Sequence, residues 1–550
     1  MKRAQGLIAA ALVLGAGVWS GGVSATASSV GPVAFSAPTF VDTQLAGGEP
    51  EVMYSFKYHT FVYTSHRGDT HLDRAGLAST GTAGFVCSTN NLTCNENNVN
   101  IWYSNDARTW TVSQESPQYT GFSDPDLTAD EAGNIYNTGI NLVNDALFSS
   151  SDGGKTWPNG TAQCAGGDRP WLAGGKAGEV FLANSTNGHT VFRSTDLGNT
   201  CSAGIADPNV YGKLYYDHLD GSLVEPLANG TDLGYTYLAN ANAAFDSGSG
   251  TFVPTTLVRN TPTIQIGGEI ALDGNQNMYM TWAPDERQPG TSGGCSGTGG
   301  GGGAATPIPN HIYFMAGRRT GPGQWSWGPR VTIYAPANST SYWPWITAGA
   351  TGNVSIVWFQ TDRVDDLDCD MMNGQVVNEN TTIYEAHILN ALDPANRTIE
   401  VVNASGRVVH SGGVCQSGTT CVATGQDRRM GDFFTNSLDA NGCVMIASGD
   451  TTQLDQLGQP QPISHPILIR QKSGPSLTGI DCATGQALSA SEASTPAPGP
   501  SLAPLPTPTA GQSPLPNTRV PGPGPMRGLL VVALACLVVV AMMRRATTLS

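Results

Sequence analysis

Charged residues are scarce in this chain. Only 13% of its 550 residues are Asp, Glu, Lys or Arg, about half the usual share. Lys and Arg number 27 against 43 Asp and Glu, which gives a formal net charge of −16. An acidic chain repels the phosphates of nucleic acids and anionic membrane surfaces, so neither class of partner is expected.

Two other signatures are missing. No pair of cysteines has the Cys-x-x-Cys spacing of a structural zinc site. No long segment outside the two termini repeats its apolar residues with the period of an amphipathic helix. The chain does contain 68 Gly, together with many Ser, Thr and Asn. This composition favours an all-β protein rich in hairpin turns.

The N-terminus has the pattern of a secretory signal peptide. Lys2 and Arg3 precede an apolar run from Leu7 to Val18, and a small-residue cleavage site ends at Ala27. Residues 1–27 are therefore predicted to be removed on export. Ten of the eleven cysteines fall in the exported part, and this even number in an oxidising compartment favours disulfides. The predicted pairs are Cys87 with Cys94, Cys415 with Cys421, and Cys295 with Cys369.

The C-terminal region changes composition twice. Residues 491–525 are Pro-rich and predict an extended linker. Residues 526–550 contain an apolar run from Gly528 to Met543, followed by Arg544 and Arg545, which predicts a single-pass membrane anchor at the cell surface. Alternatively, Leu515–Thr518 resembles the cell-wall sorting signal of Gram-positive bacteria, with Arg519 in place of its Gly.

A short motif recurs along the chain and predicts a hairpin turn. Ser150–Trp157 has the pattern Ser-x-Asp-x-Gly-x-Thr-Trp, and Ser194–Cys201 keeps all of it except the Trp. Looser copies are Ser104–Trp110 and Phe245–Phe252. The Asp of such a turn can accept backbone N–H groups, and Gly permits positive φ. The Asp residues at positions 106, 152 and 196 lie 46 and 44 residues apart, a period typical of four-stranded propeller blades.

A second pattern has a polar or Pro-containing start followed by two apolar strands around a turn with Gly. Its seven copies begin at Glu49, Asp124, Asp168, Lys213, Gly267, Trp343 and Gly431. In two copies its Pro lies 27 and 26 residues before the Asp of the turn motif, so the two patterns keep phase. The sequence therefore predicts an all-β protein with a six- or seven-bladed β-propeller over residues 28–490.

The turn motifs resemble the Asp-boxes, or bacterial neuraminidase repeats, of the sialidase superfamily of β-propellers. In such a blade the inner strand starts on the face where the second strand ends, and the Asp-box turn lies on the opposite face. The resemblance therefore implies that the motif Asp residues are structural. It also implies that a site would form where the inner strands start and the second strands end.

A sialidase binds the substrate carboxylate with several Arg side chains, protonates the leaving oxygen with a carboxylic acid, and uses a Tyr activated by a Glu as nucleophile. The family's aromatic-Arg-Ile-Pro motif is absent, and its nearest counterpart is Asp168–Trp171. The resemblance makes Asp168, Arg169 and Asp285 the catalytic candidates, with Asp168 or Asp285 as the acid. It makes Arg67, Arg287, Arg363 and Arg429 the substrate-binding candidates. Spacing does not single out the Tyr and Glu, and the alternative is that these charged residues solvate polar loops and pair with each other.

One loop is a candidate metal site. Asp366, Asp368 and Asp370 stand at alternate positions, as in some calcium loops, although Met371 and Val377 replace the Gly and Glu of an EF-hand. The alternative is an acidic, solvated loop without a metal. No other cofactor is indicated.

The predicted function is a surface-anchored, sialidase-like propeller that acts on or binds extracellular glycans, for instance as an exo-glycosidase. The alternatives are a non-catalytic binding or adhesion propeller, whose partner would be a glycan or a cell-surface protein, and a structural envelope protein. The superfamily resemblance is specific for fold and not for activity. The sequence does not define the oligomeric state.

Overall fold

The structure is a computed structural model that describes residues 31–66, 99–116, 121, 123–140, 144–185, 189–208, 212–229, 231–263, 267–284, 286, 309–364, 379–414, 427–454, 458, 461 and 463–489. The chain divides into two compact units, residues 1–502 and 503–550, and all described residues belong to the first. The predicted signal peptide, the predicted Pro-rich linker and the predicted anchor lie outside the described residues. No helix within the described ranges is long and apolar enough to span a membrane.

Seven antiparallel sheets, here called blades 1 to 7, follow one another along the chain. Blade 1 contains β3 (Glu51–Ser55), β4 (Thr60–Ser65), β5 (Asn100–Ser104) and β6 (Thr111–Val112). Blade 2 contains β7 (Ser123–Ala129), β8 (Ile135–Ile140), β9 (Asn144–Ser150) and β10 (Asn159–Ala165). Blade 3 contains β11 (Trp171–Gly174), β12 (Val180–Asn184), β13 (His189–Ser194) and β14 (Ile205–Asp207).

The later blades carry additions to the four-stranded plan. Blade 4 contains β15 (Tyr215–Asp217), β16 (Ser222–Asn229), β17 (Asp232–Leu238), a short helix α2 (Ala241–Ser247) and β18 (Val253–Val258). Blade 5 contains β19 (Glu269–Leu272), β20 (Met278–Trp282), β21 (Ile312–Gly321), β22 (Gln324–Trp327) and β23 (Val331–Tyr334). Blade 6 contains β24 (Ser341–Ala348), β25 (Val354–Thr361), β26 (Asn380–Leu389), β27 (Thr398–Asn403) and β28 (His410–Ser411).

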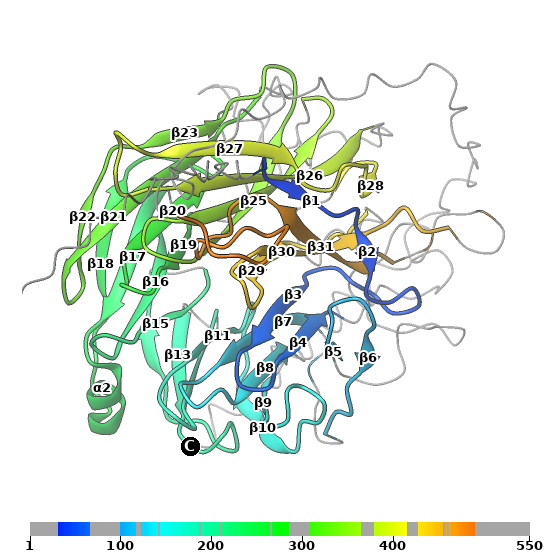
Figure 1. Cartoon of the computed structure of the whole chain (residues 1–550). Coiled ribbons are helices and arrows are strands. Elements are labelled where there is room, and N and C mark those ends of the chain that lie inside the picture. Colours follow the sequence, from blue (N-terminus) through cyan, green and yellow to red (C-terminus); the bar gives the residue numbers. More distant parts are fainter. Residues whose placement is uncertain are drawn as a thin grey trace, which may run out of the picture. The chain divides into compact units, whose positions relative to one another are not determined.

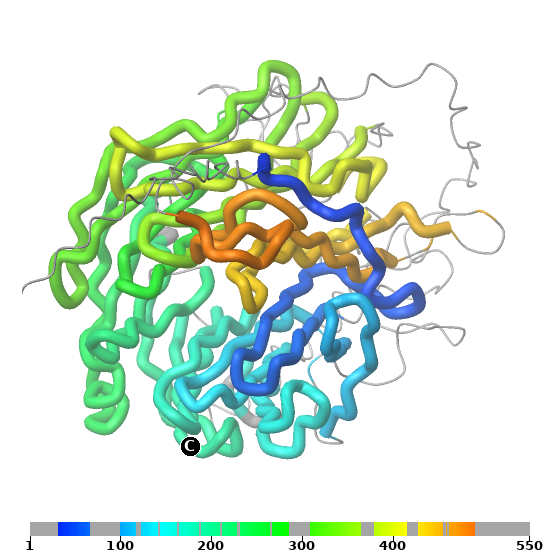
Figure 2. The backbone as a smooth tube through the Cα atoms, in the orientation of Figure 1, coloured from blue at the N-terminus to red at the C-terminus, as the bar shows by residue number. Residues whose placement is uncertain are grey.

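Blade 7 closes the ring with strands from both ends of the described chain. Its β29 (Thr435–Leu438), β30 (Val444–Asp450) and β31 (His465–Ser473) are completed by β1 (Ala34–Phe35) and β2 (Thr39–Phe40), which both pair with β31. Figures 1 and 2 show this N-terminal segment in blue beside the orange C-terminal strand. The seven inner strands β3, β7, β11, β15, β19, β24 and β29 contact one another in cyclic order. The predicted propeller is confirmed, and it has seven blades.

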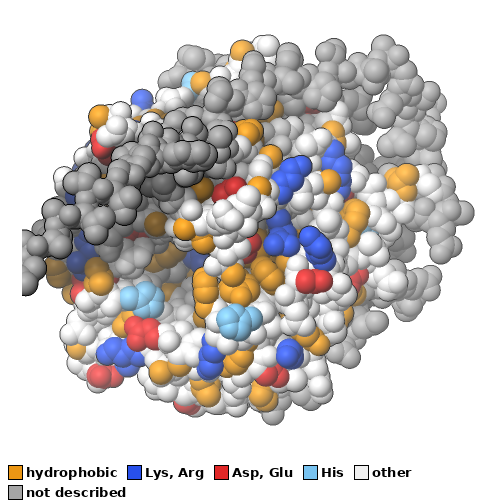
Figure 3. Space-filling model, in the orientation of Figure 1, with side chains coloured by type: hydrophobic (Ala, Val, Ile, Leu, Met, Phe, Trp, Pro, Cys, Tyr) orange, Lys and Arg blue, Asp and Glu red, His pale blue; other side chains and the backbone are white. Residues whose placement is uncertain are grey.

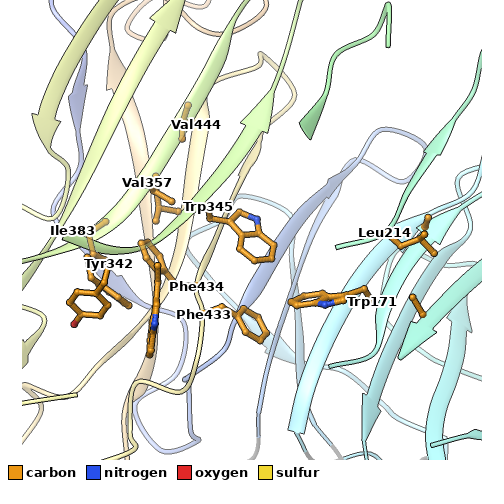
Figure 4. Packing of buried hydrophobic residues seen from close by; sticks show 14 of the residues in the cluster. Trp171, Leu214, Tyr342, Trp345, Val357, Ile383, Phe433, Phe434 and Val444 are labelled. Atoms are coloured by element: carbon orange, nitrogen blue, oxygen red, sulfur yellow. The ribbon is translucent and has the colours of Figure 1, made fainter. Parts of the chain in front are cut away.

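Aromatic side chains fill the centre where the inner strands meet. Trp171 lies with its ring centroid 5.0 Å from that of Phe433 and 5.5 Å from that of Trp345. Figure 4 shows Trp171 of β11 pointing toward these two residues of blades 7 and 6. All three are buried in the largest apolar cluster of the protein. The centre is therefore a packed core, held by apolar burial between blades that are far apart in sequence.

Two faces follow from the antiparallel order of the strands. We call the face where the seven inner strands begin the start face. The opposite face, which carries the turns between inner and second strands and between third and fourth strands, is called the turn face. On the surface shown in Figure 3, basic and acidic side chains are interspersed.

Three of the predicted Asp turns have the expected geometry. Asp152 accepts hydrogen bonds from the backbone of Lys155 (3.1 Å) and Thr156 (3.0 Å), and from the hydroxyls of Ser150 (2.8 Å) and Thr156 (2.7 Å). The equivalent bonds occur around Asp106 and Asp196. A Cβ on Gly154 would lie 2.6 Å from a Val62 methyl, so this turn packs directly on blade 1. All three turns lie on the turn face, at the end of a third strand.

The fourth copy, Phe245–Phe252, was predicted as a similar turn, and this prediction is wrong. Its Asp246 lies in α2, which begins after the N-cap Asn240 and ends at Gly248 with φ 64°. Alanines at three of the first four helical positions favour a helix here. Asp246 is exposed and pairs with Arg193 at 2.7 Å instead of locking a turn.

Two disulfides occur in the described chain. Cys164 pairs with Cys201, which connects blade 2 to blade 3 and involves the residue that replaces the motif Trp. Cys443 pairs with Cys482, which fixes the segment after β31 to the turn between β29 and β30. The general expectation of disulfides is confirmed. The predicted pairs Cys87–Cys94, Cys415–Cys421 and Cys295–Cys369 lie outside the described residues.

The stabilising role of the turn Asp residues can be tested by comparing Asp152, which lies in an Asp turn, with Asp246, which lies in α2. Asp152→Ala removes four hydrogen bonds from a partly buried turn, so we expect the free energy of unfolding to fall by about 1 to 3 kcal/mol. Asp246→Ala is the matched control, because an exposed ion pair contributes less than about 0.5 kcal/mol. Denaturant unfolding followed by circular dichroism measures both. An equal decrease in the free energy of unfolding for both variants would contradict the stabilising role assigned to Asp152 in its turn.

Candidate functional site

The start face gathers an unusual number of charged side chains. We call the rim cluster the set that lies on or just before the inner strands: Glu49, Glu51, Asp124, Asp126, Asp168, Arg169, Lys213, Tyr215, Glu269, Arg428 and Asp432. They come from six of the seven blades, and seven of them are carboxylic acids against three cationic groups. In a chain with 13% charged residues, this concentration marks the start face as the candidate site.

A shared backbone conformation places part of this cluster. Glu49, Asp124 and Arg169 each precede a Pro and have φ of 49°, 50° and 52°. Trp343 occupies the same place in blade 6 with φ 52°. Positive φ is costly for residues other than Gly and is retained where the surrounding structure demands it. The repeated Xaa-Pro start therefore turns the chain in the same way in four blades, and the side chains of blades 1 to 3 meet.

The outermost part of the rim cluster is a chain of three acids. The carboxyl group of Asp124 interacts with that of Glu49 on one side and with that of Asp168 on the other, while its two oxygens accept hydrogen bonds from Ser123 Oγ (2.7 Å) and Arg169 N (3.2 Å). Neighbouring carboxyl groups disfavour each other's ionisation. Glu49 is fully buried, Asp124 is partly buried and Asp168 is exposed. The three acids thus lead from the interior to the solvent.

The protonation of these acids is displaced toward neutral pH. Burial, reinforced by the charge of Asp432, raises the pKa of Glu49 to about 7. Burial and the neighbouring Glu49 raise the pKa of Asp124 to about 7. Enclosure by the surrounding chain and the charge of Asp124 raise the pKa of Asp168 to about 7, even though its side chain is open to solvent. Because the groups interact, the protons belong to the chain of acids as a whole.

Two further acids, Glu51 and Asp126, follow Glu49 and Asp124 two residues later on the inner strands of blades 1 and 2. The ammonium group of Lys213 is 2.6 Å from Glu51 Oε1 and 2.6 Å from Asp126 Oδ1. The other carboxylate oxygens accept backbone N–H groups of the neighbouring inner strand, Leu127 N for Glu51 and Leu172 N for Asp126, each at 2.6 Å. Glu51 and Asp126 therefore share one ammonium group, burial and the charge of Asp126 raise the pKa of Glu51, and the remaining oxygens of both acids bind the neighbouring strands.

The arginines of the start face are also paired. Arg169 lies 3.1 Å from Asp432 Oδ2, and Arg428 binds both oxygens of the same carboxylate, with Nη2 at 2.7 Å from Oδ2. Arg429 makes a two-pronged contact with Asp427, with Nη2 2.6 Å from Oδ2. All three guanidinium groups are buried. Among the described residues of the rim cluster, acid groups outnumber cations.

The sequence analysis missed Lys213 and Tyr215 as site residues. Tyr215 lies in the field of Lys213 and Glu269, and burial raises its pKa well above the usual range. Burial also raises the pKa of Glu269 to about 8, and its carboxylate accepts the backbone N–H of Lys213. The signal was present in the pattern, because Tyr215 and Glu269 stand on the inner strands of blades 4 and 5 as Glu51 and Asp126 do in blades 1 and 2.

The structure brings together only some of the residues predicted for the site. Asp168 and Arg169 both lie in the rim cluster, with Arg169 turned to Asp432. Arg429 belongs to the separate pair with Asp427. Arg363 is half-exposed and lies 3.6 Å from Asp362. The remaining candidates lie outside the described residues: Arg67, Asp285, Arg287, Asp366, Asp368 and Asp370. Within the described part of the chain, no group of three or more potential ligands could hold a metal ion.

Comparison with known proteins adds information on the fold. No protein-family model matches the chain, and no curated protein matches it in sequence. A GH93 α-L-arabinofuranosidase of Fusarium graminearum is 11% identical over 80% of this chain and 98% of its own, with a TM-score of 0.34. A PL25 ulvan lyase bound to -[GlcA(1-4)Rha3S]- is 10% identical over 81% and 96%, with a TM-score of 0.34.

Two further solved structures have other bound ligands. A leech intramolecular trans-sialidase complexed with 2,7-anhydro-Neu5Ac is 11% identical over 78% of this chain and 68% of its own, with a TM-score of 0.32. YCF48 bound to D1 peptide is 9% identical over 81% and 96%, with a TM-score of 0.39. Propellers that act on glycans are thus among the structural neighbours. Similarities this low carry no argument about activity, and the seven-bladed fold rests on the strand pairing described above.

The raised pKa values predict how stability depends on pH. For Glu49, Asp124, Asp145 and Glu269, burial raises the folded pKa to about 7 or 8. The folded state therefore holds protons that the unfolded state releases near pH 4. The stability from these groups is fully present below that unfolded value and is lost as pH rises through about 7 to 8. We expect the midpoint temperature of thermal unfolding to decrease as the pH is raised from about 5 to about 8.

Thermal unfolding followed by circular dichroism at intervals of pH checks this dependence. Glu269→Gln removes one titrating group with little change of shape, so its midpoint should fall less steeply over the upper part of the range. A midpoint that is constant or rises toward pH 8 would show that these acids are ionised in the folded protein.

Proposed function

We propose that the rim cluster binds extracellular glycans and that Asp168 acts as a general acid in the cleavage of a glycosidic bond. The observation that carries this proposal is the row of neighbouring acids Glu49, Asp124 and Asp168, in which the exposed Asp168 has its pKa raised to about 7 by enclosure and by the charge of Asp124. Glycosidases protonate the leaving oxygen with a carboxylic acid whose pKa is raised in this way. Asp124 and Glu49 stand behind Asp168 and can return a proton after each turnover.

The charge of the rim cluster supports an uncharged sugar as the substrate. Arg169 and Arg428 already bind Asp432, and Lys213 already binds Glu51 and Asp126. An anionic sugar would have to displace these internal partners and approach an excess of acids. The sialidase activity that the sequence resemblance implies needs free guanidinium groups, so an uncharged glycoside fits the described residues better.

A second candidate function is glycan binding without turnover. It is favoured by the same ion pairs, since a guanidinium paired with a neighbouring carboxylate acts as part of a scaffold. Glu51 and Asp126 are also poorly suited to serve as a nucleophile or base, because Lys213 and two backbone N–H groups bind their oxygens. In this alternative the exposed Asp168 would bind a sugar hydroxyl.

The exported, surface-anchored location is part of this proposal. The segment after β31 runs across the turn face, where Leu477 N donates to Gly442 O (2.9 Å) and Leu477 O accepts from Ala350 N (2.8 Å). Leu488 N still bonds Gly479 O at 2.8 Å. The last described segment of the chain therefore lies on the face opposite the rim cluster.

The proposal is tested by turnover. The full chain is assayed against a panel of fluorogenic glycosides that includes neutral sugars and a sialoside. We expect cleavage of a neutral glycoside, with a rate that falls as pH rises above about 7 because Asp168 must be protonated. Asp168→Asn should lower kcat by about a hundredfold or more.

Asp246→Asn, in the exposed helix α2, is the control and should leave turnover unchanged. Absence of turnover with every glycoside, together with retained binding of a sugar, would contradict glycosidase activity and support glycan binding without turnover. Full activity of Asp168→Asn would remove Asp168 from the mechanism.

A further inference from the structure

A pocket on the turn face lies far from the rim cluster along every blade that forms it. It has a volume of about 330 Å³ and is lined by the β15–β16, β19–β20 and β24–β25 turns and by the end of β21. These elements belong to the neighbouring blades 4, 5 and 6. The size falls in the range of small-molecule sites in proteins. We call it the turn-face pocket.

The walls of this pocket are held by polar contacts between blades. Arg319 donates from Nε to Asp217 Oδ2 (3.1 Å) and from Nη2 to Asp220 Oδ2 (2.7 Å), which ties blade 5 to blade 4. Asn275 donates to the hydroxyl of Thr351 at 2.5 Å, which ties blade 5 to blade 6. Side chains fixed in this way lose little freedom when a ligand binds, so the pocket is largely preformed.

The charge of the pocket comes from Arg318. Its neighbour Arg319 is neutralised by two carboxylates, whereas Arg318 is exposed and lies within ion-pair distance of no carboxylate among the described residues. Asp393 feels the charge of Arg318, but it is bound by Asn396 Nδ2 at 2.7 Å on its own turn.

The other lining groups can bind hydroxyls. Asn275, Thr320 and Thr351 are exposed and bring amide and hydroxyl groups to the pocket, and Leu219 supplies an exposed apolar edge. A guanidinium binds a carboxylate with two parallel hydrogen bonds, and amides and hydroxyls bind sugar hydroxyls. The combination fits a small ligand that carries one carboxylate and several hydroxyl groups.

We propose that the turn-face pocket binds an acidic saccharide unit of the uronate type, with Arg318 on the carboxylate and Asn275 and Thr351 on the hydroxyls. This site differs from the proposed rim site in position and in ligand class, since the rim cluster has an excess of acids. The two sites would allow one propeller to bind two parts of a glycan that differ in charge.

Isothermal titration calorimetry of the full chain with glucuronate tests the proposal, with glucose and inorganic sulfate as comparison ligands. We expect saturable binding of glucuronate that is tighter than binding of either comparison ligand. Arg318→Ala should weaken glucuronate binding by about tenfold or more, because it removes a charged hydrogen-bonding partner. Arg259→Ala, at another exposed arginine, should bind as the unchanged protein does.

Three results would overturn the proposal: no saturable binding, binding that Arg318→Ala leaves unchanged, or glucose or sulfate binding as tightly as glucuronate. Circular dichroism confirms that each variant is folded, as expected for exposed side chains. Asp168→Asn should not alter glucuronate binding, so a failure of the rim proposal and a failure of this one can be told apart.

Discussion

Carboxylates that bind the backbone of a neighbouring inner strand join three pairs of adjacent blades on the start face, beside the apolar core that fills the centre. Glu51 accepts Leu127 N, Asp126 accepts Leu172 N, and Glu49 accepts Asp432 N, each from a neighbouring blade. Inner strands start with backbone N–H groups that have no partner in their own sheet, and a buried N–H without a partner is costly. The seven-bladed ring therefore needs acceptors at this place, and acidic side chains provide them.

This structural requirement also creates the chemistry of the start face. The carboxylates that accept backbone N–H groups on adjacent blades lie close together, and burial with mutual repulsion raises their pKa values. Lys213 binds both Glu51 and Asp126, and the pKa of Glu51 is still raised by burial. Arg428 lies 3.7 Å from Glu49, and the pKa values of Glu49, Asp124 and Asp168 are raised to about 7. The proposed acid at Asp168 is the exposed end of a system that the fold itself produces.

Much of the architecture was predictable from the sequence. The seven strand starts, from Glu49 to Gly431, and three Asp turns follow from repeated local patterns, because each blade must satisfy the same turn geometry. The copy at Phe245–Phe252 failed because three alanines favour a helix over a turn. Of the candidate site, Asp168 and Arg169 were found through their Xaa-Pro context. Lys213 and Tyr215 were not, since their importance depends on contacts across blades that no local pattern records.

Pairing of these charged residues with each other was one of the alternatives from the sequence, but the particular partners were not predictable. Arg169 and Arg429 have the composition expected of an anion site, yet Asp432 and Asp427 occupy them. Which acid meets which cation depends on the register of neighbouring inner strands and on the turn of the Xaa-Pro start. The acidic rim cluster lies at the starts of the inner strands, whereas the turn-face pocket with Arg318 lies at the opposite face.

A carboxyl-carbon NMR titration of Asp168 measures directly whether this acid holds a proton near neutral pH. The carboxyl resonance of Asp168 should titrate near pH 7 in the unchanged protein. In Asp124→Asn, which removes the neighbouring charge and the acid partner, the midpoint should move toward its usual acidic value. A midpoint near pH 4 in both proteins would show that Asp168 is an ordinary exposed carboxylate and would contradict the account.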